Sequence, residues 1–312
     1  MNPLQKIGAF TAALGAAFGA AYGIGVGIGP LDADPEPAAH GESHAPPARV
    51  EAPAGLQVSE RGLTLDLRTT ALPAGRPGTL EFVVRDAHGD ALTAYDRAHG
   101  KQLHLIVASR DLTTYRHLHP VRAADGTWST PVTLPAAGAY RVFADFVPAG
   151  AEKGLTLGAD LTVTGRYTAT ELPPPSPTAT VDGYTVTLEG SLAPGRESDL
   201  TFTVRDAHGD PVTRLQPYLG AYGHLVALRS GDLAYLHVHP HDAAEGDATS
   251  GPAVSFAATT PSAGTYRLFL DFKVGGEVRT AAFTVTAGTG AGAGHTAPPP
   301  AETGHEGTHG HP

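Results

Sequence analysis

Three histidines recur at the same spacing in two places of the chain. In each copy the second histidine lies 13 positions after the first, and the third lies 15 positions after the first. The two copies lie 120 residues apart. They are His104, His117 and His119, and then His224, His237 and His239. Neutral imidazole nitrogens bind Zn(II), Cu(II) and Ni(II), so the repeated triad indicates a metal site. Surface histidines that only pack on a sheet, or a pH-sensitive histidine cluster, are the alternatives.

The residues around each triad predict a β-hairpin. Apolar residues alternate with the histidines, as in a strand with one buried face. If the turn of the first copy is centred on residues 110–111, His104 faces His117 across the hairpin. The equivalent pairing in the second copy places His224 opposite His237. The third histidine of each triad then lies diagonally from the first, on the same face.

The alternation also predicts which face carries the histidines. If the leucines and valines of the hairpin point into a core, the histidines point outward. The later strand, residues 140–146, flanks the hairpin in an immunoglobulin-like strand order and brings Asp145 to the outer patch, and Asp271 is its counterpart. The predicted metal ligands are therefore His104, His117, His119, Asp145, His224, His237, His239 and Asp271.

The rest of the chain predicts an all-β protein with two tandem immunoglobulin-like β-sandwich domains. Short alternating segments are separated by Gly, Pro and Asp, and residues 84–90 return unchanged at 204–210, which indicates a duplicated domain. The expected organisation is a disordered stalk at 30–55, β-sandwiches at 56–166 and 180–288, a Pro-rich linker at 167–179, and a disordered His-rich tail at 289–312.

The N-terminal segment predicts a membrane anchor. Residues 7–29 form an uncharged segment that is long enough to cross a bilayer as a helix. Lys6 precedes the segment and acidic residues follow it, so we expect the folded domains outside the cytoplasm. A cleaved secretory signal is the alternative.

Composition excludes several classes of function. The net charge is −10 and no basic run occurs, which argues against a nucleic-acid partner. The chain has no Cys, which excludes disulfides, thiolate zinc sites, blue-copper centres and cysteine nucleophiles. We find no Ser-His-Asp order, catalytic carboxylate pair or phosphate-binding loop, so we expect a protein that is not an enzyme.

Two motifs resemble known families. Residues 215–226, followed by 235–240, are similar to bacterial exported or membrane-anchored tandem β-sandwich proteins with a repeated His…His-x-His-Pro motif. More distantly, the chain resembles YtkA-like and copper-resistance extracytoplasmic domains. The resemblance covers both predicted sandwiches and implies heavy-metal handling. Residues 237–239 also look like the copper-binding His-x-His of copper-zinc superoxide dismutases, but the chain has no matching zinc loop and no Cys.

These observations lead to one expected function and two alternatives. We expect a membrane-anchored extracytoplasmic protein that binds a divalent heavy metal, copper before zinc, through the histidine hairpin of each domain. It would buffer the metal or deliver it to a metal-transport partner protein. The first alternative is a cell-surface adhesion or scaffold module without metal, and the remote alternative is a superoxide-dismutase-like enzyme.

Overall fold

The computed structural model describes residues 10, 11, 13–20, 22, 53–236, 238–244, 246 and 248–288. The chain divides into two compact units, residues 1–50 and 51–312. The described residues of the first unit are helical. Among the described residues, no helix reaches the length and hydropathy that a membrane span requires. The predicted tail at 289–312, most of the predicted stalk and part of the predicted anchor lie outside the described residues.

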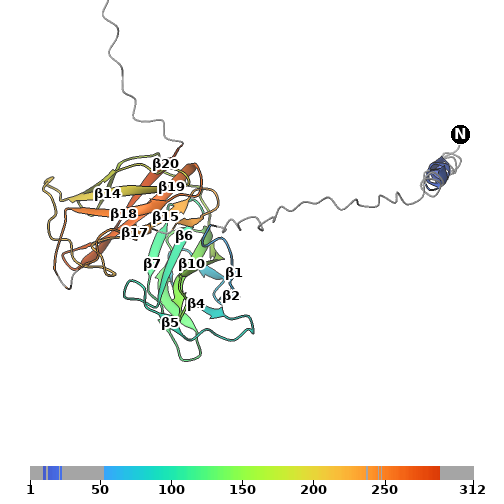
Figure 1. The fold of residues 1–312 in the computed structure, drawn as a ribbon, viewed down its shortest axis with the longest axis horizontal. Helices are drawn as coiled ribbons and strands as arrows, with labels where there is room; N and C mark the ends of the chain where they lie inside the picture. The colour runs from blue at the N-terminus through green and yellow to red at the C-terminus, as the bar shows by residue number, and fades with distance from the viewer. Residues whose placement is uncertain are drawn as a thin grey trace, which may run out of the picture. The chain divides into compact units, whose positions relative to one another are not determined.

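The first half of the second unit is a β-sandwich (Figure 1). One sheet has the strand order β1-β2-β4-β9-β8, and the other has the order β3-β11-β10-β6-β7, with β5 paired to β10. The strands are β1 (Ser59–Glu60), β2 (Leu63–Leu67), β3 (Ala71–Pro73), β4 (Pro77–Arg85), β5 (Tyr95–Asp96), β6 (Leu103–Ser109), β7 (Tyr115–Leu118), β8 (Val121–Arg122), β9 (Trp128–Thr133), β10 (Gly138–Pro148) and β11 (Leu155–Thr164).

The second half is another β-sandwich of the same design. Its sheets have the orders β12-β13-β14-β18-β17 and β16-β15-β19-β20. The strands are β12 (Thr178–Val181), β13 (Tyr184–Glu189), β14 (Glu197–Arg205), β15 (His224–Arg229), β16 (Tyr235–Leu236), β17 (Val238–Pro240), β18 (Ala253–Thr259), β19 (Gly264–Val274) and β20 (Glu277–Ala287). The predicted all-β fold with two tandem sandwiches is confirmed.

Each sandwich has its own core, filled by alternate residues of its strands. On β6, Leu103, Leu105 and Val107 are buried in the first core. On β15, Leu225 and Ala227 take the same place in the second core. The side-chain period of a strand is two, so the residues between them, including His104, lie on the opposite face of the sheet. The predicted orientation of the hairpin is confirmed.

The first histidine hairpin forms with a register that differs from the predicted one by two residues. Ile106 pairs with His117, and Leu105 pairs with Leu118, so His117 does not lie directly opposite His104. The reason is a longer turn, in which Asp111 accepts hydrogen bonds from the Ser109 hydroxyl at 2.5 Å and the Thr113 amide at 3.1 Å. A shift by an even number of residues keeps every side chain on its face, so His104 and His117 are diagonal neighbours.

The second hairpin has the same two-residue shift and then leaves its sheet. Ala227 pairs with Leu236, but the next strand, β17, pairs with β18 in the opposite sheet. The side chain of Val238 packs against the second core, and His239 is exposed. The expectation that His239 shares a patch with His224 is therefore wrong. His237, predicted to face His224, lies outside the described residues.

A third apolar cluster joins the two sandwiches. Each sandwich contributes two residues of the first strand of its histidine hairpin, a leucine of the hairpin loop, a tyrosine and a phenylalanine. All are buried: Ile106, Ala108, Leu112, Tyr115 and Phe143 from the first, and Val226, Leu228, Leu233, Tyr235 and Phe269 from the second. The rings of Tyr115 and Phe269 stack with centroids 4.1 Å apart, and those of Phe143 and Tyr235 lie 5.7 Å apart. We call this set the interface cluster.

The interface cluster corrects one expectation. Each sandwich keeps its own core, as expected for two domains, but their outer sheet faces are in contact. The histidines were expected to face outward into solvent, but the face that they share with the interface cluster is covered, and His104 is only 3% exposed. Burial of both faces explains why the apolar sequence of β6 continues through Ile106 and Ala108.

Replacing Phe269 by Ala is expected to lower the free energy of unfolding by about 3 kcal/mol or more, since it leaves a cavity in a close-packed cluster. Urea denaturation of the full chain measures the change. Tyr167→Ala is the control, because Tyr167 is an aromatic residue that is 60% exposed, and its effect should be about 1 kcal/mol or less. Equal effects of the two substitutions would show that the sandwiches do not pack through this face.

Candidate metal centre

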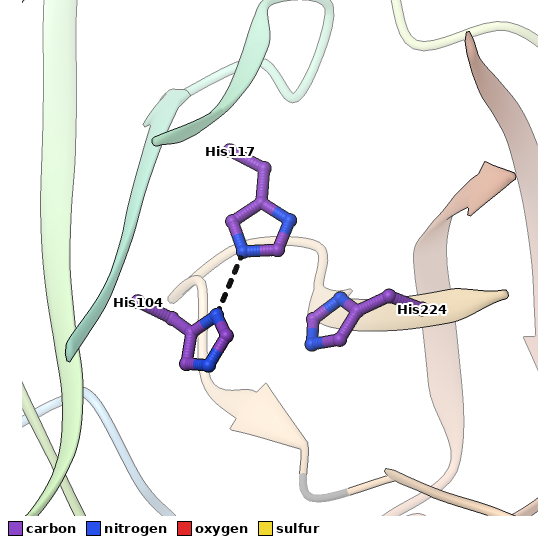
Figure 2. Close-up of side chains that lie close together, drawn as sticks. All are labelled: His104, His117 and His224. Carbon is purple, nitrogen blue, oxygen red and sulfur yellow. Dashed lines mark hydrogen bonds between the residues drawn. The ribbon is translucent and has the colours of Figure 1, made fainter. Parts of the chain in front are cut away.

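His104, His117 and His224 lie together where the two sandwiches meet. They come from β6, β7 and β15, and one nitrogen of each ring lies within 4.8 Å of the others (Figure 2). The ring centroids of His117 and His224 are 4.6 Å apart, and those of His104 and His224 are 5.5 Å apart. Among the described residues, this is the one group of three His, Asp or Glu side chains with such geometry. Among the described residues, the cluster combines two histidines of the first predicted triad with His224 of the second, so its candidate ligands come from both sandwiches.

Each predicted aspartate lies beside the first histidine of its own repeat. Asp145 pairs with His104 between β10 and β6, and Asp271 pairs with His224 between β19 and β15. The expected position of the flanking strand is therefore confirmed. The Asp145 carboxylate accepts a hydrogen bond from the Thr156 hydroxyl at 2.9 Å.

Asp271 links the two sandwiches through the cluster. Its Oδ2 accepts a hydrogen bond from His117 Nδ1 at 2.8 Å, and its Oδ1 accepts one from the Thr280 hydroxyl at 2.5 Å. The side chains of His117 and Asp271 are 3% and 2% exposed, so this bond lies in a region of low dielectric. Asp271 orients an imidazole of the other sandwich, which is the role of the carboxylates that support metal-binding histidines.

The hydrogen bonds fix which nitrogens of His104 and His117 carry a proton. His104 Nε2 lies 3.1 Å from the carbonyl oxygen of Ala98, and His117 Nδ1 bonds to Asp271. A carbonyl or carboxylate oxygen only accepts, so both ring nitrogens donate. In the neutral rings, His104 Nδ1 and His117 Nε2 therefore keep their lone pairs.

These two lone pairs face each other at 3.1 Å. Two acceptors cannot bond to each other, so a proton or a metal cation must lie between them. Ligand nitrogens of a tetrahedral zinc ion are about 3.3 Å apart, given Zn–N distances near 2.0 to 2.1 Å. The observed separation fits a shared metal ion.

His224 supplies a third nitrogen to this space. Its Nδ1 is buried and has no hydrogen-bond partner. Burial is the main cause that lowers the pKa of His224 well below its ordinary value, and the neighbouring histidines lower it further. Burial likewise lowers the pKa of His104 to about 3, although the hydrogen bond to the Ala98 carbonyl acts to raise it. Both rings are neutral at pH 7, the form in which imidazole binds a metal.

His119 lies at the edge of the cluster. Its ring centroid is 4.8 Å from that of His117 and 5.2 Å from that of His104, and its Nε2 is buried without a hydrogen-bond partner. Burial, followed by His117 and Lys101, lowers its pKa to about 4. The structure thus brings one entire predicted triad, His104, His117 and His119, into one place.

Sequence reasoning missed two residues beside the cluster. The ring of His99 lies 6.1 Å from His104 and 6.0 Å from His224, and the ring of Tyr218 lies 6.3 Å from both His117 and His119. Each belongs to a tight turn, and His99 itself has a positive φ of 51°. Neither residue recurs in the other repeat, so the repeated pattern carried no signal for them.

A known family covers most of the chain. Residues 57–164 and 179–289 match a family described as "Domain of unknown function (DUF8832)". The chain belongs to the DUF8832 family. The two matched segments agree with the duplication seen in the sequence and in the fold. No curated protein sequence matches this DUF8832 chain.

Solved structures show distant similarity to the DUF8832 chain. The adhesin FdeC of Escherichia coli is 19% identical over 74% of this chain and 65% of its own, with a TM-score of 0.25. InvD of Yersinia pseudotuberculosis is 15% identical, with coverages of 77% and 62% and a TM-score of 0.25. Domains 4 and 5 of the S-layer protein SbsC are 15% identical, with coverages of 74% and 98% and a TM-score of 0.23. These similarities assign no function to the DUF8832 chain.

The metal-free protein is expected to lose stability as the pH falls below about 6.5. The pKa of His104 is near 3 in the folded chain and near 6.5 in the unfolded chain, so between these values only the unfolded chain binds the proton. His104 then lowers the free energy of unfolding by up to about 2 kcal/mol between pH 6.5 and 5, and His119, which is less buried, lowers it by a smaller amount. Urea denaturation across this range should show a shallower decline for His104→Gln and an unchanged one for His88→Gln, at an exposed turn. Equal declines in both variants would contradict the burial of a neutral His104.

Proposed function

We propose that this protein binds one divalent heavy-metal ion between its two sandwiches and buffers or delivers it. The observation that carries the proposal is the 3.1 Å approach of His104 Nδ1 and His117 Nε2, on two rings whose other nitrogens bond to the Ala98 carbonyl and the Asp271 carboxylate. His224 adds a third buried nitrogen from the other sandwich. The farthest of the three nitrogens, at up to 4.8 Å, must move inward by about 1.5 Å to complete a tetrahedral set.

Copper is the preferred metal, before zinc. The site offers imidazole nitrogens and no thiolate, since the chain has no Cys, and such a site suits Cu(II) as well as Zn(II). Cu(II) is the highest of the divalent ions in the general order of affinity. The proposal is for a binding protein and not an enzyme, and its partners would be the metal ion and a metal-transport protein.

The proposed location is outside the cytoplasm, at the cell membrane. It rests on the uncharged residues 7–29, with Lys6 before them and acidic residues after them. If the segment is cleaved, the same protein would be secreted. The absence of Cys fits a site whose metal ligands do not depend on the redox state of the compartment.

Metal titration of the full chain against a competing chelator should reveal one tightly bound Cu(II) or Zn(II) ion. His224→Ala should lower the affinity for this ion by more than about 100-fold. The loss of a ligand costs more affinity than the 10- to 100-fold that is typical when a residue behind a ligand is changed. His239→Ala is the matched control from the same repeat and should leave the affinity unchanged, because His239 is exposed on β17. Two tight ions, one of them lost in His239→Ala, would favour separate hairpin sites. No tight ion would favour the scaffold alternative.

Asp271→Asn should lower the affinity for the same metal ion by about 10- to 100-fold, although it removes no ligand. The substitution removes the charge that holds the Nδ1 proton of His117 and orients its ring. Asp145→Asn, at the equivalent position of the first repeat, is the control, and its hydrogen bond with Thr156 predicts a smaller effect. The same competition titration measures both. A larger loss in Asp145→Asn would contradict the assigned role of Asp271.

A further inference from the structure

A basic cavity lies beside the metal centre on the first sandwich. Its volume is about 350 Å³, and its lining includes Arg97, Lys101 and Arg122, together with His119 and Trp128. No Asp or Glu is among the described residues that line it. In a chain with a net charge of −10, three cationic side chains without a lining acid form a local region of opposite sign.

The cations of this cavity are not used in ion pairs within the described residues. The guanidinium carbon of Arg122 lies 5.7 Å from the ring centre of Tyr95 and 5.8 Å from that of Trp128, so two aromatic rings hold the group in place. Arg122 Nε is buried and has no hydrogen-bond partner. Arg97 and Lys101 are exposed, so their charges are available to a bound anion.

The internal duplication shows that the fold does not require these cations. At a spacing of 120 residues, Arg97 corresponds to Pro217, and Lys101 corresponds to Ala221. Arg122 corresponds to Asp242, which has the opposite charge. The turn between Ala98 and Lys101 is nevertheless repeated, since Tyr218 and Ala221 form the same bridge. The basic cavity is therefore a property of the first repeat alone.

His119 connects the cavity to the metal centre. It lines the cavity, and its ring lies 4.8 Å from that of His117. The loop that carries Arg97 and Lys101 also supplies the Ala98 carbonyl that fixes the proton on His104. A molecule in the cavity would thus be one side chain away from the opposed nitrogens.

We infer that this cavity binds an anionic carboxylate complex of the metal, so that the ion enters or leaves the centre as a chelate and not as a free cation. The inference rests on the proposed function. Three positive charges repel a free divalent cation but attract a complex whose carboxylates outnumber the charge of the metal. Arginine side chains recognise carboxylates through paired hydrogen bonds. The cavity volume suits a small chelate.

Stopped-flow transfer of Cu(II) to the full chain tests the inference. The two donors are the anionic nitrilotriacetate complex and the neutral bis-glycinate complex, both at low ionic strength. The double variant Arg97→Gln, Lys101→Gln should take up copper from the nitrilotriacetate complex about 10-fold more slowly, and from the glycinate complex at an unchanged rate. The control Arg76→Gln, Arg196→Gln removes the same charge from exposed sites elsewhere and should change neither rate appreciably.

The outcomes separate this inference from the proposed function. If the double variant takes up copper from the nitrilotriacetate complex at the wild-type rate, or more slowly by the same factor from both complexes, the anion site is overturned. The amount of copper bound at equilibrium tests the metal centre separately, and it should be the same in the double variant and the wild-type chain. Uptake from neither complex by the wild-type chain would overturn the proposed function and this inference with it. Metal-free citrate provides an independent check. It should bind the wild-type chain in calorimetry more tightly than it binds the double variant.

Discussion

The contact between the two outer sheet faces is the constraint on which the site depends. A single sandwich would expose its histidine hairpin to water, where the imidazoles would titrate near their ordinary values. Packing of the interface cluster removes that water and brings together His117 of one sandwich and Asp271 of the other. The duplication supplies both halves of the contact, because each repeat offers the same kind of apolar face.

Two similar repeats nevertheless build one asymmetric centre. In the first repeat the chain continues on the same face as far as His119, which stays beside His104. In the second repeat the chain crosses to the opposite sheet at β17, and His239 becomes exposed. One repeat therefore supplies most of the candidate ligands, while the other supplies His224 and the carboxylate that orients His117.

The period of the strands made a large part of the fold predictable. Alternation in β6 placed His104 on the face opposite Leu103 and Leu105, and an even shift in register did not alter that face. The register itself depends on hydrogen bonds of Asp111 in the turn, which the sequence pattern does not specify. Sequence spacing also could not show that the strand after Leu236 changes sheets.

The association of the sandwiches has a signal in the sequence of β6. Residues 103–108 are apolar on both faces except for His104, and a strand of that kind is buried on both sides. The alternating pattern was assigned one buried face, so His104 was expected in solvent. Which second surface covers the strand depends on long-range packing, and a single sequence gives no direct measure of it.

Anomalous diffraction from crystals of the copper-loaded protein is the most direct test of a metal shared by the two sandwiches. One strong copper peak should lie between His104, His117 and His224, with nitrogens of all three at about 2.0 to 2.1 Å, the distance at which imidazole binds Zn(II). A peak bound by the histidines of only one sandwich, with neither ring nitrogen of His224 at binding distance, would contradict the account.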